Sequence, residues 1–343
     1  MRRTRMLAAF AVALAALSLT SVAQADTRLA HVSRPTLVNA YNRTVVWSAF
    51  DDAAQVYRLT AYRRGKVTTL PVPPSDSVFD ADIGVDSNAR PVVTYSRCNQ
   101  PREKLPFISA PATADCDLYL YRFGTAAEQK LTRFSRSGVP EILPAVWGNR
   151  IAFARTQANP VGGDCITYVW VGDLRNGKQR RLARGTLGNY KTEPPCHLFV
   201  TSPTSIDIRA NVVAFAWYYN PSGCDDGAEL WLVRIGHPRK KLEGRCGGNR
   251  FTPVSLTKYR VFDMSFGSVA HPNLSYFTPN LRRYDFRSGT YFEARQKNAD
   301  SFGVSDGKQI YLLRQAGSDP DPSGYYVVAR PLTGFERSRR DRG

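Results

Sequence analysis

A short apolar strand that ends in an aromatic residue recurs along this chain, and its spacing limits the possible folds more than any other feature. The first copy is Thr44-Val45-Val46-Trp47. Successive aromatic positions lie 48, 58, 62, 47 and 49 residues apart, at Trp47, Tyr95, Phe153, Phe215, Phe262 and Tyr311. A repeat of this length accommodates one four-stranded sheet with its loops, and such sheets stack around a common axis. The spacing therefore predicts six similar units.

Another strand follows the marker strand in each unit and leads into a hairpin. Several of these strands, such as Thr167-Tyr168-Val169-Trp170-Val171, are apolar at both alternating positions. Strands of this kind are covered on both faces. Turn residues come next, for example Asn176-Gly177, a strong signal for a two-residue hairpin. We therefore predict an all-β fold, a six-bladed β-propeller of four-stranded antiparallel blades.

The two ends of the repeat region predict how the ring closes. The sixth unit lacks a fourth strand, because the chain turns polar after Pro331. Residues 28–33 form a strand candidate that belongs to no unit. Pairing this N-terminal strand with the last blade would remove two open sheet edges, which otherwise invite aggregation. We predict this closure, with the propeller spanning residues 26–335 and residues 336–343 forming a basic, disordered tail.

The first 25 residues predict export. Arg2, Arg3 and Arg5 form a basic segment, Met6 to Val22 are apolar, and Ala23-Gln24-Ala25 fits a small-x-small cleavage site. A signal peptide of residues 1–25 is therefore expected, with a mature chain that begins at Asp26. No later stretch is long and apolar enough to span a bilayer. We expect a secreted or extracytoplasmic protein of the cell envelope, and a monomer.

The cysteines agree with export. The six lie between residues 98 and 246, and an even number in an exported chain indicates disulfide bonds. Many pairings are possible from the sequence. Joining sequence neighbours gives Cys98–Cys116, Cys165–Cys196 and Cys224–Cys246. No Cys-x-x-Cys pair occurs, so a thiolate metal site is not expected.

The formal net charge of +18 limits the partners. A strongly basic chain suits nucleic acid, an anionic membrane or an acidic polymer, unless the charge is dispersed for solubility. An exported chain does not normally meet nucleic acid. The expected partner is therefore a protein or an anionic cell-envelope polymer.

One repeat resembles a known family. Ser305-Asp306-Gly307-Lys308-Gln309-Ile310-Tyr311 is similar to the "Ser-Pro-Asp-Gly-Lys, apolar, aromatic" signature of TolB-like propeller repeats. Asp117-Leu118-Tyr119 through Lys130-Leu131-Thr132 resembles the second half of that repeat. The resemblance implies the propeller fold. Units three and four depart from it at Gly148-Asn149 and Ala210-Asn211. The TolB protein carries an extra α/β domain for which this chain has no room, so its partner binding does not transfer.

The first strand of each unit should line the central channel, and acidic residues recur there. The candidate ligand-binding residues are Asp80, Asp82, Glu141, Asp207 with Arg209, and Asp300. Converging carboxylates could hold a hard cation such as Ca²⁺, or a basic ligand. The alternative is that they cap turns and accept backbone N–H groups. No Gly-x-Ser-x-Gly elbow, phosphate loop or zinc-binding helix pattern occurs, so no catalytic or metal-ligating residue is assigned.

These observations predict a non-catalytic binding scaffold, because propellers offer loops on two faces and a funnel on the axis. No cofactor is expected for it. The alternative is a Ca²⁺-dependent hydrolase or lyase that acts on a lactone or glycan in the axial channel. The channel acids discriminate between the two: three or more in one axial pocket favour the enzyme, and bonds to turn backbones favour the scaffold.

Overall fold

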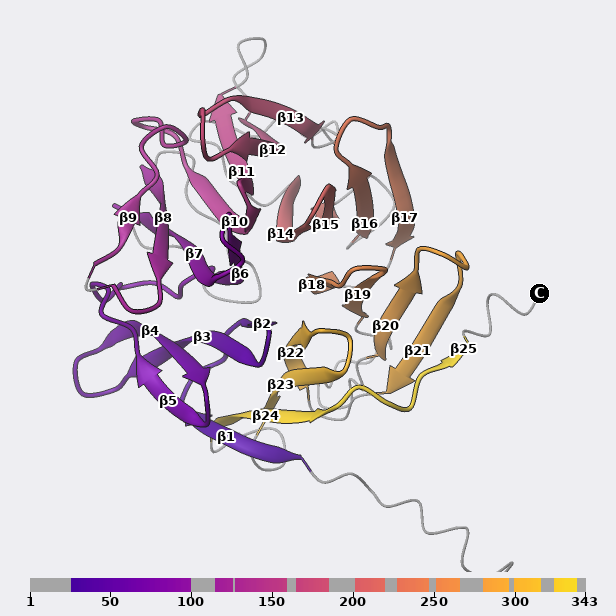
Figure 1. Cartoon of the computed structure of the whole chain (residues 1–343), viewed down its shortest axis with the longest axis horizontal. Coiled ribbons are helices and arrows are strands. Elements are labelled where there is room, and N and C mark those ends of the chain that lie inside the picture. Colours follow the sequence, from indigo (N-terminus) through magenta and orange to yellow (C-terminus); the bar gives the residue numbers. More distant parts are fainter. Residues whose placement is uncertain are drawn as a thin grey trace, which may run out of the picture.

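Strands arranged around a central axis make up the protein, which has a propeller-like, all-β architecture (Figure 1). The computed structural model describes residues 26–99, 115–125, 127–158, 165–184, 201–219, 227–246, 251–265, 280–295, 299–315 and 324–337. Within these ranges there is no helix long and apolar enough to cross a membrane.

The strands follow one another as the repeat predicted, in antiparallel meanders whose first strand lies nearest the axis (Figure 1). Unit one contains β2 (Val38–Tyr41), β3 (Thr44–Asp51), β4 (Val56–Arg63) and β5 (Lys66–Thr69). Unit two contains β6 (Asp82–Asp86), β7 (Pro91–Cys98), β8 (Cys116–Arg122) and β9 (Gln129–Lys130). Unit three contains β10 (Glu141–Gly148), β11 (Arg150–Ala158), β12 (Cys165–Asp173) and β13 (Gln179–Arg184).

The second half of the chain repeats this order. Unit four contains β14 (Thr201–Arg209), β15 (Val212–Tyr219), β16 (Gly227–Arg234) and β17 (Arg239–Cys246). Unit five contains β18 (Phe251–Leu256), β19 (Arg260–Ser265), β20 (Asn280–Asp285) and β21 (Tyr291–Arg295). Unit six contains β22 (Ala299–Ser305), β23 (Gln309–Gln315) and β24 (Tyr325–Pro331).

The sheets differ from the prediction of six separate blades in one respect. Units two and three form a single eight-stranded sheet, because β6 pairs in parallel with β10. The pairing joins Val85 to Trp147 and Asp86 to Gly148, at the ends of these inner strands. The strands therefore form five sheets among the described residues. Unit five also gains an outer strand, β25 (Glu336–Arg337), which pairs with β21 and includes the first two residues of the predicted tail.

The N-terminal strand closes the last sheet, as the sequence predicted. β1 (Thr27–Val32) pairs antiparallel with β24, from Thr27 opposite Ala329 to Val32 opposite Tyr325. The sheet order is β1-β24-β23-β22, so Thr27–Val32 supplies the strand that unit six lacks. Because the first and last segments share one sheet, the edge of β24 is covered.

The core lies between neighbouring sheets, which explains strands that are apolar on both faces. Val46 and Leu59 of unit one pack against Phe79, Ile83 and Tyr95, which belong to unit two or lead into it. A similar cluster joins units six and one across the closure, where buried Trp47 shares a core with the marker residue Tyr311. Each sheet therefore buries both faces against its neighbours.

Gly84 offers a test of how closely units two and three approach. A Cβ atom at Gly84 would lie 1.8 Å from the carbonyl oxygen of Val146, a backbone atom of β10 that cannot move aside alone. We expect Gly84→Ala to lower the free energy of unfolding by about 1–3 kcal/mol, the usual cost of overpacking. Denaturant unfolding of the purified protein measures this.

Gly65→Ala is the matched control for that variant. Gly65 has φ +82° but nothing within 4 Å of the added Cβ, so the control carries conformational strain without a clash. The control shows the cost of strain alone, and a loss of stability in Gly84→Ala below about 1 kcal/mol would contradict the close approach of β6 and β10.

Candidate functional site

A pocket lies on the axis where the inner strands of several units meet. It is small, with room for about one water molecule, and it opens to solvent. The residues that give it chemical character are Tyr41 on β2, Asp82 on β6, Trp147 on β10, Asp207 and Arg209 on β14, and Ser255 on β18. Five of the units contribute to the wall, so the ring itself assembles this site.

Two of the predicted channel carboxylates, Asp82 and Asp207, meet in this pocket. Burial raises the pKa of Asp82 well above its ordinary value, and the nearby charge of Asp207 raises it further. Burial also raises the pKa of Asp207, to about 7, although the Leu256 N–H and the Arg209 charge oppose the change. Asp207 keeps some solvent contact through the pocket, yet protein surrounds its carboxyl group.

The surroundings of the two carboxyl groups differ. Oδ2 of Asp207 accepts a hydrogen bond from the backbone N–H of Leu256, 2.5 Å away on the next unit. Oδ2 of Asp82 is buried and has no hydrogen-bond partner among the described residues, although backbone N–H groups of Ile83 and Val146 bond to this carboxyl group and partly oppose the rise of its pKa. A hydrogen bond from N–H favours the ionised carboxylate, whereas an unpartnered buried oxygen favours the neutral acid. The pair therefore tends to hold one proton, on Asp82.

Arg209, the predicted basic residue of the channel, stacks on aromatic rings at the pocket wall. Its guanidinium carbon lies 4.7 Å from the ring centroid of Trp147 and 5.7 Å from that of Tyr41. The two rings meet edge to face, with centroids 5.3 Å apart. Nη1 of Arg209 donates to the carbonyl oxygen of Leu256 at 3.3 Å. Cation–π contacts and this hydrogen bond hold the guanidinium in place beside the acids.

Asp80 does not join the pocket, which corrects the expectation that it lines the channel. Its carboxylate accepts hydrogen bonds from N–H and Oγ–H of Ser96, both at 2.7 Å, and from N–H of Leu143 at 2.6 Å. Because Leu143 belongs to β10, Asp80 links unit two to unit three. This is the alternative role in which the acid binds backbone N–H groups.

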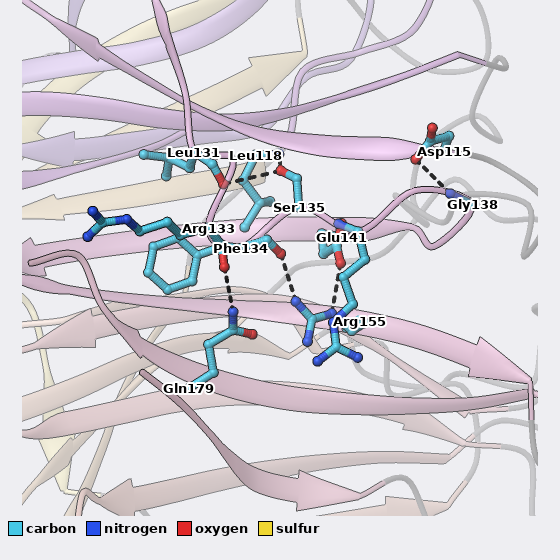
Figure 2. A network of polar contacts seen from close by, with 11 residues as sticks. Asp115, Leu118, Leu131, Arg133, Phe134, Ser135, Gly138, Glu141, Arg155 and Gln179 are labelled. Carbon is cyan, nitrogen blue, oxygen red and sulfur yellow. Dashed lines mark hydrogen bonds and ion pairs between the residues drawn. The ribbon is translucent and has the colours of Figure 1, made fainter. Parts of the chain in front are cut away.

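Glu141 is also absent from the pocket and forms a buried ion pair instead (Figure 2). Nε of Arg155 lies 2.7 Å from Oε1 of Glu141, and both side chains are fully buried. Nη2 of Arg155 donates to the carbonyl oxygen of Phe134 at 2.7 Å, which ties the segment before β10 to β11 (Figure 2). Burial raises the pKa of Glu141 and lowers that of Arg155.

The remaining predictions have mixed outcomes. Asp300 belongs to β22, but its side chain lies outside the described residues. The described residues hold no cluster of three or more His, Cys, Asp or Glu side chains that could bind a metal ion. The Cys98–Cys116 disulfide is confirmed and joins opposed residues of β7 and β8. Cys196 and Cys224, and with them the other two predicted pairs, lie outside the described residues.

Sequence reasoning missed Tyr41 and Trp147. Both occupy the place that Arg209 occupies in its own unit, directly before the turn between the first and second strands. These positions lie at the ends of inner strands, which are nearest the axis, and their residues line the pocket. Aligning the units on that turn, rather than on the aromatic marker of the second strand, would have grouped the three residues.

Comparisons with known proteins show similarity at the level of the fold. No family model matches the chain, and no curated protein matches it. An oligogalacturonate lyase from Vibrio parahaemolyticus matches with a TM-score of 0.53 and 10% identity, over 93% of this chain and 82% of the lyase. An α-L-arabinofuranosidase from Fusarium graminearum has a TM-score of 0.51 and 8% identity, over 91% and 97%. An α-L-arabinanase from Penicillium chrysogenum, complexed with arabinobiose, has a TM-score of 0.50 and 9% identity, over 90% and 98%.

The Glu141–Arg155 pair predicts a specific pattern of stabilities. We expect Arg155→Leu to lower the free energy of unfolding by about 3–5 kcal/mol, because it leaves the buried Glu141 carboxylate without its partner. The double variant Glu141→Leu/Arg155→Leu should be less destabilised than Arg155→Leu, since removing both charges leaves none unpaired. Denaturant unfolding measures all three proteins, and a double variant less stable than the single one would refute the pairing.

Proposed function

We propose that the protein is a carbohydrate-active enzyme, a hydrolase or lyase, whose active site is the axial pocket. The observation that carries this proposal is the meeting of Asp82 and Asp207, two carboxyl groups of raised pKa, in one pocket on the axis. Two like charges in a site of low polarity cannot both ionise easily, and their pKa values separate into those of an acid and a base.

The surroundings of the pair assign the two roles. Asp82, which lacks a hydrogen-bond partner on Oδ2 among the described residues, holds the proton and acts as the general acid toward the leaving oxygen. Asp207, held by the Leu256 N–H and close to Arg209, is the general base. In a hydrolase this base would deprotonate water. In a lyase it would remove the proton next to a uronate carboxylate, and Asp82 would still protonate the oxygen that leaves.

The mouth of the pocket suits an acidic sugar that lies over it. Trp147 and Tyr41 hold the guanidinium of Arg209 there, and this guanidinium provides donors for an acidic substituent. The three similar structures in the comparisons are glycan-acting proteins by name, which supports this class of activity for a pocket on this fold. In this proposal the six units are the blades of one closed six-bladed propeller, exported to the cell envelope, and the ring positions the site.

A non-catalytic binding scaffold is the second candidate. It is favoured by the positions of Asp80 and Glu141, which stabilise the fold instead of adding to the pocket. Only two of the predicted acids meet in the pocket, fewer than the three that favoured the enzyme. The two functions differ in turnover: a scaffold would bind a glycan without cleaving it.

Turnover by Asp82 and Asp207 variants tests the enzyme. We expect the wild type to cleave at least one member of a panel of arabinan and uronate oligosaccharides, seen as new reducing ends or as an unsaturated product. Asp82→Asn and Asp207→Asn should each reduce kcat by roughly 10²–10⁴-fold, the usual contribution of a general acid or base. Asp52→Asn, an exposed carboxylate outside the pocket, is the control. Full turnover in both pocket variants would refute the assignment.

The raised pKa of Asp207 makes a second prediction, which needs no substrate. A carboxyl group whose pKa is raised on folding binds more protons in the folded state, so its contribution to stability declines as pH rises from its ordinary range to about 7. The stability of Asp207→Asn relative to the wild type should therefore increase across that interval. Unfolding free energies of the two proteins from pH 4 to 8 measure the difference, and a flat difference would contradict a raised pKa.

A further inference from the structure

A ring of basic residues surrounds the mouth of the axial pocket. We name the turns that join the first and second strands of each unit the axial turns. Every axial turn contains a basic residue or lies directly beside one: Arg43, Arg90, Arg150, Arg209, Lys258 and Lys308. Tyr41, Trp147 and Arg209 of the pocket wall stand immediately before three of these turns, so the pocket opens at this end.

The topology gathers these residues on one face. In an antiparallel meander, the turn after the first strand and the turn after the third strand lie at the same end of the sheet. Backbone hydrogen bonds confirm it: Leu174 N–H donates to the carbonyl oxygen of Asn149, and Ile235 N–H to that of Asn211, both at 2.7 Å. The inner strands surround the axis, so their turns surround it too (Figure 1).

Neighbouring turns bind one another in places, which fixes the spacing of the charges. Nη1 of Arg150 donates to the carbonyl oxygen of Ala210 at 3.2 Å and to the side chain of Asn211, on the axial turn of the next unit. N–H of Arg43 donates to Oγ of Ser305 at 2.9 Å, beside the axial turn of unit six.

The acids on these turns, Asp86 and Asp306, offset only part of the positive charge of the ring. Oδ1 of Asp86 accepts N–H groups of Asn88 and Arg90, at 2.8 and 2.9 Å, and so caps its own turn. Asp306 accepts a hydrogen bond from Ser305. Arg43, Arg90, Lys258 and Lys308 are exposed, and none forms an ion pair with another described residue. Charges of one sign around a concave site raise the local concentration of ligands of the opposite sign.

Arg43 stands where a glycine would be easier to accommodate. Its φ is +58°, and Asn42 before it also has a positive φ, of 45°. L side chains are strained in this region, where glycine and asparagine are preferred. The backbone therefore gives no reason for an arginine at this position, and glycine could replace it without strain.

We propose that this basic ring binds an acidic polysaccharide, and that a uronate unit of the polysaccharide lies over the mouth of the pocket beside Arg209. Cleavage of this polysaccharide rests on the proposed function, whereas its binding does not. A sugar acid suits the mouth better than other anions, because its hydroxyl groups can donate to the half-buried Asp207 while its carboxylate faces Arg209.

Binding of three defined probes tests the ring. Calorimetry with the full mature chain would compare an oligogalacturonate, a neutral arabinan oligosaccharide of equal length and a DNA oligonucleotide of equal charge. We expect the oligogalacturonate to bind most tightly, with an affinity that falls as salt is added. Equal binding of the neutral oligosaccharide, or tighter binding of the DNA, would overturn the proposal.

Charge removal locates the binding surface. Arg43→Gln/Lys258→Gln/Lys308→Gln removes three exposed charges from adjacent axial turns and should weaken binding of oligogalacturonate by about tenfold or more at low salt. Arg28→Gln/Arg136→Gln/Arg180→Gln removes the same charge from exposed positions outside these turns and should leave at least a third of the affinity. Equal losses in the two variants would overturn the ring as the site.

A single variant separates binding from folding. Arg43→Gly relieves the positive φ, so its Tm should equal or exceed that of the wild type while its affinity for oligogalacturonate falls. Retained affinity of Arg43→Gly for oligogalacturonate would count against the ring.

Asp82→Asn should still bind the oligogalacturonate probe, so loss of turnover with intact binding would support both proposals. Binding by a wild type that cleaves no glycan would refute only the proposed function.

Discussion

Side chains, more than backbone ladders, join most of the inner strands of this ring to one another. Oγ of Ser205 accepts the N–H of Val254, and Oγ of Ser255 accepts the N–H of Val304. Oγ of Ser301 accepts the N–H of Val38 across the closure, and Asp80 accepts the N–H of Leu143. Each bond satisfies a buried backbone donor that has no partner in the backbone ladders. The pocket depends on these bonds because its walls come from separate units.

Bulges in the first strands make those bonds possible. The register shifts between Pro203 and Ser205, between Thr252 and Ser255, and between Ala299 and Ser301. A bulge turns the following side chain away from the regular alternation. The serine after each of these bulges thereby reaches the neighbouring unit.

The sequence predicted the parts of the fold that follow from periodicity. The marker strands ending in Trp47 and Tyr311, the closing strand that begins at Thr27 and the Cys98–Cys116 bond were all readable from spacing and residue type. The joining of units two and three was not, because it depends on Gly84 allowing the Val146 carbonyl to approach. A single glycine gives no such signal in sequence.

The candidate site was predictable only in part, for a geometric reason. Sheets stand radially around the axis, so most side chains of an inner strand point sideways at the neighbouring sheets. Asp80 and Glu141 do not point along the axis: Asp80 bonds Ser96, and Glu141 pairs with Arg155, its opposed residue on the adjacent strand of the same sheet. Strand membership alone therefore does not place an acid in the channel. Asp207 and Arg209 reach the pocket because they lie near the end of β14, beside its axial turn.

Asp207 and Ser205 both accept a backbone N–H group of the next unit, but only Asp207 can carry a charge. Asp207 accepts the N–H of Leu256, and two residues earlier Ser205 performs the same task for Val254 with a neutral hydroxyl. Joining unit four to unit five therefore requires a hydrogen-bond acceptor at these positions but no charge.

A carboxyl group whose pKa is raised by burial costs stability at neutral pH, as Glu141 would without Arg155. Asp207 has no guanidinium at ion-pair distance among the described residues, since Arg209 stacks on Trp147. The fold thus bears a carboxyl group on the axis that its architecture does not require, in contrast to Glu141, whose charge is paired inside the core.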